Sequence, residues 1–353
     1  MVVVPGSKDE ELELYANAAP TPTPTRGSSR LVRIAGPTLP YDRTYHLLGR
    51  LDKIRRRVRA ERPHILESHS CYLGTAAVVA CGRGASLVRT AFWHSDHVGT
   101  YVEPRLGRLG GGLWWVPRVL LAPFDATFVA GEVQALKLRA AGVRNVVHVP
   151  FGVDVEVFRP GARDPATRRR LTAGASGPLL VGVGRFAFEK RWDVVLEAFA
   201  RVLSSHPHAT LVLFGDGPER ERLERRAPPG VRFAGFEADR TRLAAALASA
   251  DVLIHGCPYE TFGLGVAEAV ASGVPVVVPD AGGAAESADP TCSETYRALD
   301  AQGCAAAIAR LLARNPGELR AQAVDAVARV PTVEQHFARV MGVYEDLLRE
   351  RGR

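Results

Sequence analysis

The chain of 353 residues has little cysteine and no long apolar run. Its five cysteines are an odd number and no two are spaced as C-x-x-C, so the sequence indicates neither a disulfide framework nor a zinc site. No stretch approaches the roughly 18 uninterrupted apolar residues of a membrane-spanning helix. The first residues lack a basic region ahead of a long apolar one. We therefore expect no signal peptide and a cytoplasmic protein.

Two common phosphate-binding signatures are also absent. The chain contains neither the P-loop pattern G-x-x-x-x-G-K-[ST] nor a three-glycine dinucleotide fingerprint after a strand. The formal net charge is +7 and the excess is arginine-rich. Global charge alone is weak evidence for an anionic partner, and we expect no nucleic-acid partner.

The length and the hydrophobic pattern predict two α/β domains. A single core rarely grows past roughly 250–300 residues. Short β-branched runs alternate with helical patterns, which is typical of βαβ units around parallel sheets. The expected strands are 31–34, 64–67, 86–91, 126–129, 145–149, 179–183, 209–214, 231–233, 252–255 and 274–278. The expected helices are 45–59, 72–81, 105–120, 132–141, 192–204, 219–226, 240–249, 263–271, 302–312 and 333–351.

A Pro/Gly-bounded stretch at 150–160 separates the two series of elements and is the best hinge in the sequence. We expect an N-terminal domain at 1–152, a C-terminal domain at 153–328, and a last helix at 329–353 that packs back toward the first domain. Open parallel sheets bind ligands at the carboxyl ends of their strands. Functional residues are therefore expected in the loops that follow strands.

One such loop combines glycine with two cations. The predicted strand 179–183 is followed by Gly184 and Arg185, and Lys190 stands just before the next helix. Glycine lets a backbone approach a ligand closely, and two cations near a helix N-terminus suit a diphosphate. Taken alone, the segment is equally consistent with a turn that carries two solvated cations.

A second loop carries paired carboxylates around a helix start. Glu260 follows the predicted strand 252–255, and Glu268 lies eight residues further on, within the helix that begins near Gly263. The free N–H groups and the dipole of a helix N-terminus can hold phosphate oxygens. One carboxylate can accept hydrogen bonds from ribose hydroxyls, and the other can orient a sugar.

In the first half, Ala91-Phe92-Trp93-His94-Ser95-Asp96 follows a predicted strand. A lone histidine at such a place is more often structural than catalytic. Further along, Asp154-Val155-Glu156 superficially resembles a D-x-D metal motif, but we interpret it as a surface loop and expect no metal site.

Together these segments resemble the retaining glycosyltransferases of the GT-B fold, and most of all glycosyltransferase family 4. The resemblance rests on Glu260-x7-Glu268 with the following A-x-A-S-G-V-P-V-V, on Gly184-Arg185 with Glu189-Lys190, and on the segments 214–218 and 151–160. It covers roughly residues 40–350. It implies an α/β architecture of two Rossmann-like doubly wound domains that face each other across a cleft.

The resemblance also implies roles for residues at matching positions. Arg185 and Lys190 would bind the diphosphate of the donor, and Glu268 the nucleotide ribose. Glu260 and His94 would lie beside the transferred sugar. Further neighbours of the donor or the sugar would be Asp96 and Tyr101 in the first half and Gly184, Gly215, Gly217, Phe262, Gly263 and Leu264 in the second.

The implied reaction moves a hexose from a nucleotide sugar to a glycan or lipid-linked acceptor with retention of configuration and without a metal or cofactor. A GDP-linked mannose is the first expectation for the donor and a UDP-linked hexose the second. The Phe-Trp-His-Ser-Asp segment, with a Tyr-Val downstream, resembles the mannosyltransferase-type and sulfolipid-synthase-like branch of the family.

One departure from the family leaves alternatives open. Family members open with an apolar strand and a Gly-Gly loop, whereas Met1–Gly6 resembles the second strand of the family, so the first strand and its loop are expected to be missing. The alternatives are a truncated or non-catalytic nucleotide-sugar-binding paralogue and a nucleotide-sugar epimerase on the same architecture.

A basic run at Arg50–Arg62 holds seven cations and two acids. On a helix it makes a broad cationic face. Such a face is either solvated or attracted to anionic lipid headgroups. Attraction to lipid headgroups would place the protein at the inner face of the cytoplasmic membrane.

Overall fold

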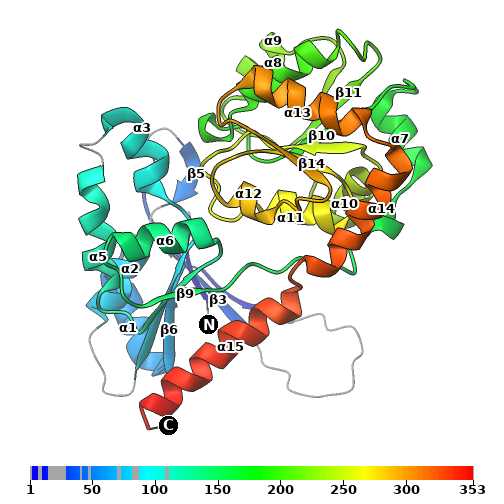
Figure 1. Ribbon diagram of the computed structural model, residues 1–353. Helices are drawn as coiled ribbons and strands as arrows, with labels where there is room; N and C mark the ends of the chain where they lie inside the picture. Colours follow the sequence, from blue (N-terminus) through cyan, green and yellow to red (C-terminus); the bar gives the residue numbers. More distant parts are fainter. Residues whose placement is uncertain are drawn as a thin grey trace.

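The computed structural model of the chain contains a parallel sheet in each half of the sequence (Figure 1). It describes residues 2–6, 10–14, 29–39, 42–46, 49–69, 73–81, 87–107 and 111–352. The two sheets confirm the α/β fold class that the alternation of strand and helix patterns predicts.

The sheet of the C-terminal half has six parallel strands in the order β12-β11-β10-β13-β14-β15. Counted from its first strand, this is the order 3-2-1-4-5-6 of a dinucleotide-binding fold. The central strands are buried apolar runs because helices cover both faces of the sheet. The strands are β10 (Leu179–Val183), β11 (Thr210–Phe214), β12 (Val231–Gly235), β13 (Val252–Ile254), β14 (Val276–Pro279) and β15 (Ser293–Tyr296).

Helices cover this sheet on both sides (Figure 1). In the view drawn, α8 and α13 lie above the sheet, and α10, α11 and α12 lie below it. The helices of this half are α7 (Pro165–Thr172), α8 (Trp192–Val202), α9 (Arg220–Arg226), α10 (Arg240–Ala248), α11 (Leu264–Ala271), α12 (Gly283–Ser287), α13 (Ala301–Ala313) and α14 (Pro316–Ala326).

The N-terminal half is built on four parallel strands in the order β6-β7-β8-β9. These are β6 (Ile65–Ser68), β7 (Val88–Trp93), β8 (Ala126–Val129) and β9 (Val146–His148), and β8 has the bounds that its sequence predicts. The helices here are α1 (Leu51–Glu61), α2 (Leu73–Ala80), α3 (Glu103–Leu106), α5 (Trp115–Leu121) and α6 (Glu132–Ala140).

Two smaller sheets complete the N-terminal half. Strand β3 (Ser29–Ala35) pairs in parallel with β1 (Val2–Gly6) and antiparallel with β2 (Glu10–Leu14). Strands β4 (Thr38–Leu39) and β5 (Asp42–His46) form an antiparallel pair. The segment at 2–6 therefore forms a strand at one edge of a three-stranded sheet.

The chain passes between the halves at two adjacent places. Val153 and Thr332 form a β-bridge, and a Cβ on Gly152 would lie only 2.2 Å from the carbonyl oxygen of Thr332. Beyond this crossing, α15 (Val333–Glu350) starts with a Thr332–Gln335 capping box and runs back along the N-terminal half, where Tyr344 packs edge-on against Phe128 (Figure 1).

Two predicted helices differ from the observed ones. The helix expected at 45–59 begins at Leu51, because the preceding Asp42–His46 pairs as strand β5. The helix expected at 105–120 is interrupted, since α3 ends at Leu106. The next residue, Gly107, has a φ of +52° that favours glycine and stops a helix. Gly112–Trp114 forms a 3-10 turn, and the α5 helix that follows ends at Leu121.

Candidate active site

Strands β10 and β13 are neighbours at the centre of the six-stranded sheet, and the helices that follow them, α8 and α11, lie on opposite sides of it. The two loops therefore leave the same carboxyl edge of the sheet toward opposite faces, and such an edge is where these folds bind ligands. The predicted diphosphate segment follows β10 and the predicted carboxylate segment follows β13. The topology thus brings together two segments that are about 70 residues apart, as in the Lys190–Glu260 contact.

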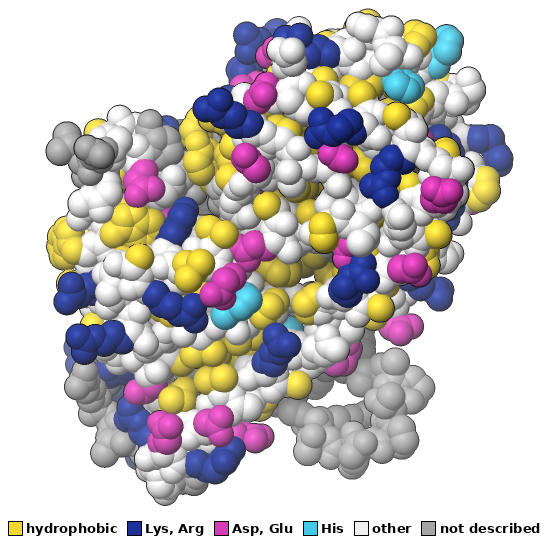
Figure 2. Space-filling view, in the orientation of Figure 1, with side chains coloured by type: hydrophobic (Ala, Val, Ile, Leu, Met, Phe, Trp, Pro, Cys, Tyr) yellow, Lys and Arg dark blue, Asp and Glu magenta, His cyan; other side chains and the backbone are white. Residues whose placement is uncertain are grey.

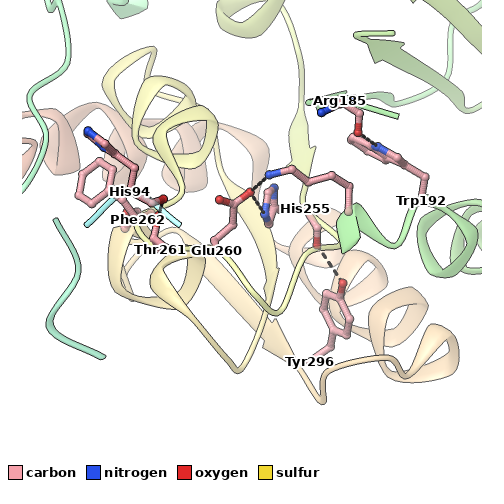
Figure 3. A network of polar contacts seen from close by, with 10 residues as sticks. His94, Arg185, Trp192, His255, Glu260, Thr261, Phe262 and Tyr296 are labelled. Carbon is pink, nitrogen blue, oxygen red and sulfur yellow. Dashed lines mark hydrogen bonds and ion pairs between the residues drawn. The ribbon is translucent and has the colours of Figure 1, made fainter. Parts of the chain in front are cut away.

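Close backbone packing holds the loop after β10. Gly215 follows β11, and a Cβ there would lie 1.9 Å from the carbonyl oxygen of Gly184, so only glycine fits without a shift. Gly217 packs as closely against the carbonyl oxygen of Phe186, at 2.4 Å. The carbonyl oxygen of Arg185 accepts a hydrogen bond from Trp192 Nε1 at 2.9 Å, and the Arg185 residue itself is exposed (Figure 3).

Glu260 is the centre of a buried polar cluster. Its Oε1 forms an ion pair with the ammonium of Lys190, and the Nε2 atom of buried His255 lies 3.4 Å from the same oxygen (Figure 3). Burial alone would raise the pKa of Glu260, but the adjacent His255 and Lys190 hold it well below its usual value. Burial alone would likewise lower the pKa of Lys190, but the carboxylate raises it. The two groups therefore remain an ion pair at neutral pH.

His255, Cys257 and Glu260 form a set of three metal-ligating side chains whose ligand atoms lie within 4.8 Å of one another. One observation disfavours a metal ion there. The ammonium of Lys190 already contacts Glu260, so these residues fit an ion pair better than a metal ion.

Helix α11 starts beside this cluster. Gly263, at its N-cap, has a φ of +88°, and a Cβ there would lie 2.9 Å from Ala284 Cα. The N–H groups of Leu264 and Gly265 open the helix and have no carbonyl one turn earlier to accept from them. Inside the helix, Glu268 is buried, its pKa is raised by that burial, and its Oε1 lies 3.4 Å from Arg240 Nη2.

His94 follows β7 in the N-terminal half and lies in a stack of rings. It is parallel to Phe92 at 4.5 Å and to Phe151 at 5.6 Å between ring centroids. Its backbone oxygen accepts a hydrogen bond from Thr261 Oγ1 at 2.9 Å, and Figure 3 shows His94 beside Thr261 and Phe262. The structure therefore brings His94 to the loop that carries Glu260.

Asp96 lies deeper in the N-terminal half. Its oxygens accept hydrogen bonds from Gly99 N at 2.7 Å and Gln134 Nε2 at 3.3 Å, and Lys137 Nζ lies 3.2 Å away. These contacts account for the burial of its carboxylate. Tyr101 is partly exposed, and its ring centroid is 6.0 Å from that of His97. A role on the substrate for either residue stays a prediction.

A second contact joins the two halves next to the site. Glu286 on α12 accepts hydrogen bonds from the backbone N–H groups of Glu132 (2.6 Å) and Val133 (2.7 Å), at the start of α6. A carboxylate is favourable there because the N-terminus of a helix carries partial positive charge. On the face shown in Figure 2, acidic, basic and histidine side chains gather where the two halves meet.

Each half of the chain matches a known protein family. A family profile described as Glycosyltransferase Family 4 matches residues 2–157, and a profile described as Glycosyl transferases group 1 matches residues 177–314. The chain belongs to glycosyltransferase family 4. Its two parallel α/β sheets are those of the GT-B fold of these glycosyltransferases, as the resemblance in the motifs predicts.

Curated relatives in the family cover parts of the chain. A GDP-mannose-dependent alpha-(1-6)-phosphatidylinositol dimannoside mannosyltransferase of Mycobacterium tuberculosis is 43% identical over 138 residues, which are 39% of this chain and 36% of that protein. A GDP-mannose-dependent alpha-mannosyltransferase of Mycolicibacterium smegmatis is 36% identical over 226 residues, 63% of this chain and 58% of that protein. The matches thus span between about a third and three fifths of these relatives.

Solved structures show the same fold at lower identity. A sucrose-phosphate synthase from Thermosynechococcus elongatus superposes with a TM-score of 0.74 at 20% identity, covering 91% of this chain and 84% of that one. HepE from Anabaena, in complex with UDP-glucose, superposes with a TM-score of 0.71 at 18% identity, covering 89% and 86%.

Sequence reasoning missed several residues of the site. Arg240 and His255 contact the two glutamates of the motif, and Glu67 and His69 lie behind His94. His255 ends the apolar run before the Glu260 loop, and a polar residue there is a usable signal. Arg240 and His69 carry no local signal, because their importance comes only from contacts between distant segments.

Proposed function

We propose that the protein is a retaining glycosyltransferase that moves a mannosyl group from GDP-mannose to a glycolipid or glycan acceptor. The observation that carries the proposal is the contact of Thr261 with His94, which joins the Glu260 loop of one half to the His94 segment of the other. This contact lies next to Glu260 in the sequence and supports a site formed between the two halves.

The diphosphate would lie at the carboxyl edge of β10 and β13. Arg185, Lys190 and the free N–H groups at the start of α11 surround that edge and offset negative charge. The diphosphate would replace Glu260 as a partner of the Lys190 ammonium. Glu268, buried within α11 and close to Arg240, would accept hydrogen bonds from the ribose.

The proposed reaction breaks the bond between the anomeric carbon and the phosphate oxygen, and the diphosphate leaves with the electron pair. The acceptor oxygen forms its bond to the same face of the sugar and gives its proton to the departing phosphate. Charge develops on the phosphate, where Arg185, Lys190 and the helix amides would stabilise it without reorganisation. Glu260 and His94 would hold the sugar from the two halves.

The identity of the donor follows from the relatives. The two curated relatives described above are named as GDP-mannose-dependent, and one of them acts on a phosphatidylinositol dimannoside. We therefore place GDP-mannose ahead of a UDP-hexose and a mannolipid ahead of other acceptors.

The N-terminal half offers a surface for a membrane that carries such an acceptor. None of the helices in the described part of the chain combines the length and hydropathy that a membrane span requires. Helix α1 buries Ile54 and Val58 and exposes arginines of the basic run, including Arg55 and Arg56. Helix α5 exposes Trp115, and both helices pack on α2. Exposed cations and an exposed aromatic residue in the same half of the molecule suit anionic lipid headgroups.

The test is an assay of donor turnover with GDP-mannose, UDP-glucose and a mannolipid acceptor, run with and without EDTA. We expect GDP release from GDP-mannose and an α-linked product, with no loss in EDTA. Glu260→Gln should lower kcat by about 10²–10³-fold, and Glu221→Gln, on the exposed side of α9, serves as the control. An inverted product, an epimerised donor, or loss of activity in EDTA that added metal restores would contradict the proposal.

A further inference from the structure

Behind His94 lies a chain of hydrogen-bonding groups that the glycosyltransferase motifs do not include. Nε2 of His69 lies 2.8 Å from Glu67 Oε1, and Nδ1 of the same ring lies 2.7 Å from His94 Nε2. Glu67 and His69 come from β6 and the residue that follows it, next to the strand that carries His94. His69 therefore lies between Glu67 and His94 and contacts each of them through one ring nitrogen.

The carboxylate at the end of the chain is firmly held. Its other oxygen, Oε2, accepts hydrogen bonds from Thr90 Oγ1 at 2.8 Å and from the hydroxyl of Tyr344 on α15 at 2.6 Å. Burial alone would raise the pKa of Glu67, but hydrogen bonds from His69, Tyr344 and Thr90 lower it. Glu67 is therefore ionised at neutral pH and only accepts hydrogen bonds.

An accepting carboxylate at one end determines the protons along the chain. A neutral His69 ring that donates to Glu67 carries its proton on Nε2, so its Nδ1 has a lone pair and accepts from Nε2–H of His94. Burial, with His69 nearby, lowers the pKa of His94 to about 4, so His94 is neutral as well. A neutral ring protonated on Nε2 leaves Nδ1 as an acceptor.

We propose that Glu67 and His69 are positioning residues that hold His94 as its Nε2–H tautomer, so that Nδ1 accepts a hydrogen bond from a substrate hydroxyl. This inference rests on the proposed function for the role of His94 on the sugar. The ring stack fixes the plane of the imidazole, with Phe92 at 4.5 Å and Phe151 at 5.6 Å between centroids. The hydrogen bonds from Glu67 through His69 then determine which nitrogen of the His94 ring carries the proton.

Protonation of His69 would reverse this arrangement. An imidazolium donates from both nitrogens, so His94 Nε2 would become the acceptor and Nδ1 would carry the proton. The titratable groups that face the two rings are Glu67 from β6 and His336 from α15. The Nδ1–H of His336 donates a hydrogen bond to the carbonyl oxygen of Pro150 at 2.8 Å.

Glu67→Gln is the decisive variant. Because two hydroxyl groups donate to Oε2, the amide oxygen takes that place and the amide nitrogen faces His69. The proton of His69 then lies on Nδ1, which donates to His94 Nε2. The proton of His94 lies on Nδ1, so His94 becomes the Nδ1–H tautomer. Tyr344→Phe is the matched control, since it removes a hydrogen bond to Glu67 from the oxygen that His69 does not contact.

The experiment combines ¹⁵N NMR of the histidine rings with turnover and nucleotide binding of the full chain. We expect the Nε2–H form of His94 in the wild type and in Tyr344→Phe, and the Nδ1–H form in Glu67→Gln. The kcat of Glu67→Gln should fall by about ten- to a hundredfold while stabilisation by GDP is unchanged. His69→Asn, whose amide oxygen can replace Nδ1 as an acceptor, should retain more activity than His69→Leu.

An unchanged His94 tautomer in Glu67→Gln would overturn the inference, and so would equal activity of His69→Asn and His69→Leu. These outcomes are separable from a failure of the proposed function. If GDP does not stabilise the wild type and no donor turns over, the proposed function fails, whereas the NMR result still decides whether Glu67 and His69 control the proton on His94.

Discussion

The hydroxyl of Thr261 donates a hydrogen bond to the backbone oxygen of His94 across 2.9 Å, and the two residues are 167 positions apart. Thr261 directly follows Glu260, so this bond fixes the distance between the carboxylate loop of one half and the histidine segment of the other. Gly131 packs against the same residue, since a Cβ there would lie 2.3 Å from the carbonyl oxygen of Thr261. The site thus depends on how the two halves meet.

Thr261→Val should separate donor binding from turnover. The variant keeps the side-chain shape and removes one hydrogen bond, so the free energy of unfolding should fall by about 1 kcal/mol. GDP affinity should be retained, because the nucleotide contacts are proposed within the C-terminal half, while kcat should fall. Urea unfolding measures the free energy of unfolding, and a donor-turnover assay measures kcat. The exposed Thr241→Val variant is the control. Equal kcat in both variants would show that the bond has no role in catalysis.

The Lys190–Glu260 pair should contribute to stability as a buried ion pair. The side chains are 22% and 17% exposed, so Glu260→Gln leaves an ammonium with little water around it. We expect a loss of about 2–3 kcal/mol in the free energy of unfolding, somewhat below the range for a fully buried pair.

The matched control is Glu197→Gln, whose partner Arg201 is 51% exposed and whose loss should cost less than about 0.5 kcal/mol. The double variant Lys190→Met with Glu260→Gln completes a double-mutant cycle. Its loss in the free energy of unfolding should be smaller than the sum of the losses in the two single variants. Additive effects would mean that the two side chains do not interact in solution.

His94 should make the fold sensitive to acid. Its folded-state pKa is lowered from 6.5 to about 4, mainly by burial and next by His69. Above pH 6.5 the ring is neutral in both states and contributes no pH dependence. Between pH 6.5 and 4 the unfolded chain binds more protons, so stability falls as the pH falls. His94→Gln should flatten the slope of stability against pH, whereas the exposed His208→Gln should not. An unchanged slope in His94→Gln would contradict the lowered pKa of His94 in the folded state.

The basic face of α1 should bind anionic vesicles. Arg55→Ser with Arg56→Ser removes two exposed charges, and Arg225→Ser with Arg226→Ser removes the same charge from α9 in the other half. Cosedimentation with phosphatidylglycerol vesicles at low salt should weaken by about tenfold or more in the α1 variant alone, since each juxtamembrane cation contributes about 1 kcal/mol. Equal weakening in both variants would indicate non-specific attraction by net charge.

Much of the fold was predictable because the relevant patterns are local. The apolar runs at Leu179–Val183 and Val252–Ile254 are buried strands, and their alternation with helices indicates a parallel sheet. The placement of Lys190 beside Glu260 also follows once these strands are known to be neighbours, because both loops leave the same edge of the sheet. The domain boundaries inferred from the Pro/Gly-rich stretch stay predictions.

The remainder depends on long-range pairing that leaves no local pattern. The helix pattern at 45–59 overlaps the end of Asp42–His46, which pairs with Thr38–Leu39 as a strand. His69 has a role only because β6 lies beside β7, which places its ring 2.7 Å from that of His94. Arg240 reaches Glu268 from a different helix. Physical contacts of this kind appear only when the tertiary structure is known.

The most direct test of the account is thermal unfolding with GDP, UDP and ADP, without added metal, for the wild type, Glu268→Ala and the exposed control Glu221→Ala. At a GDP concentration of a hundred times Kd, binding should stabilise the wild type and Glu221→Ala by about 2.7 kcal/mol and raise Tm by several degrees. Glu268→Ala should melt cooperatively but show little shift. A wild type that melts cooperatively with no shift from any nucleotide would contradict the proposed donor site.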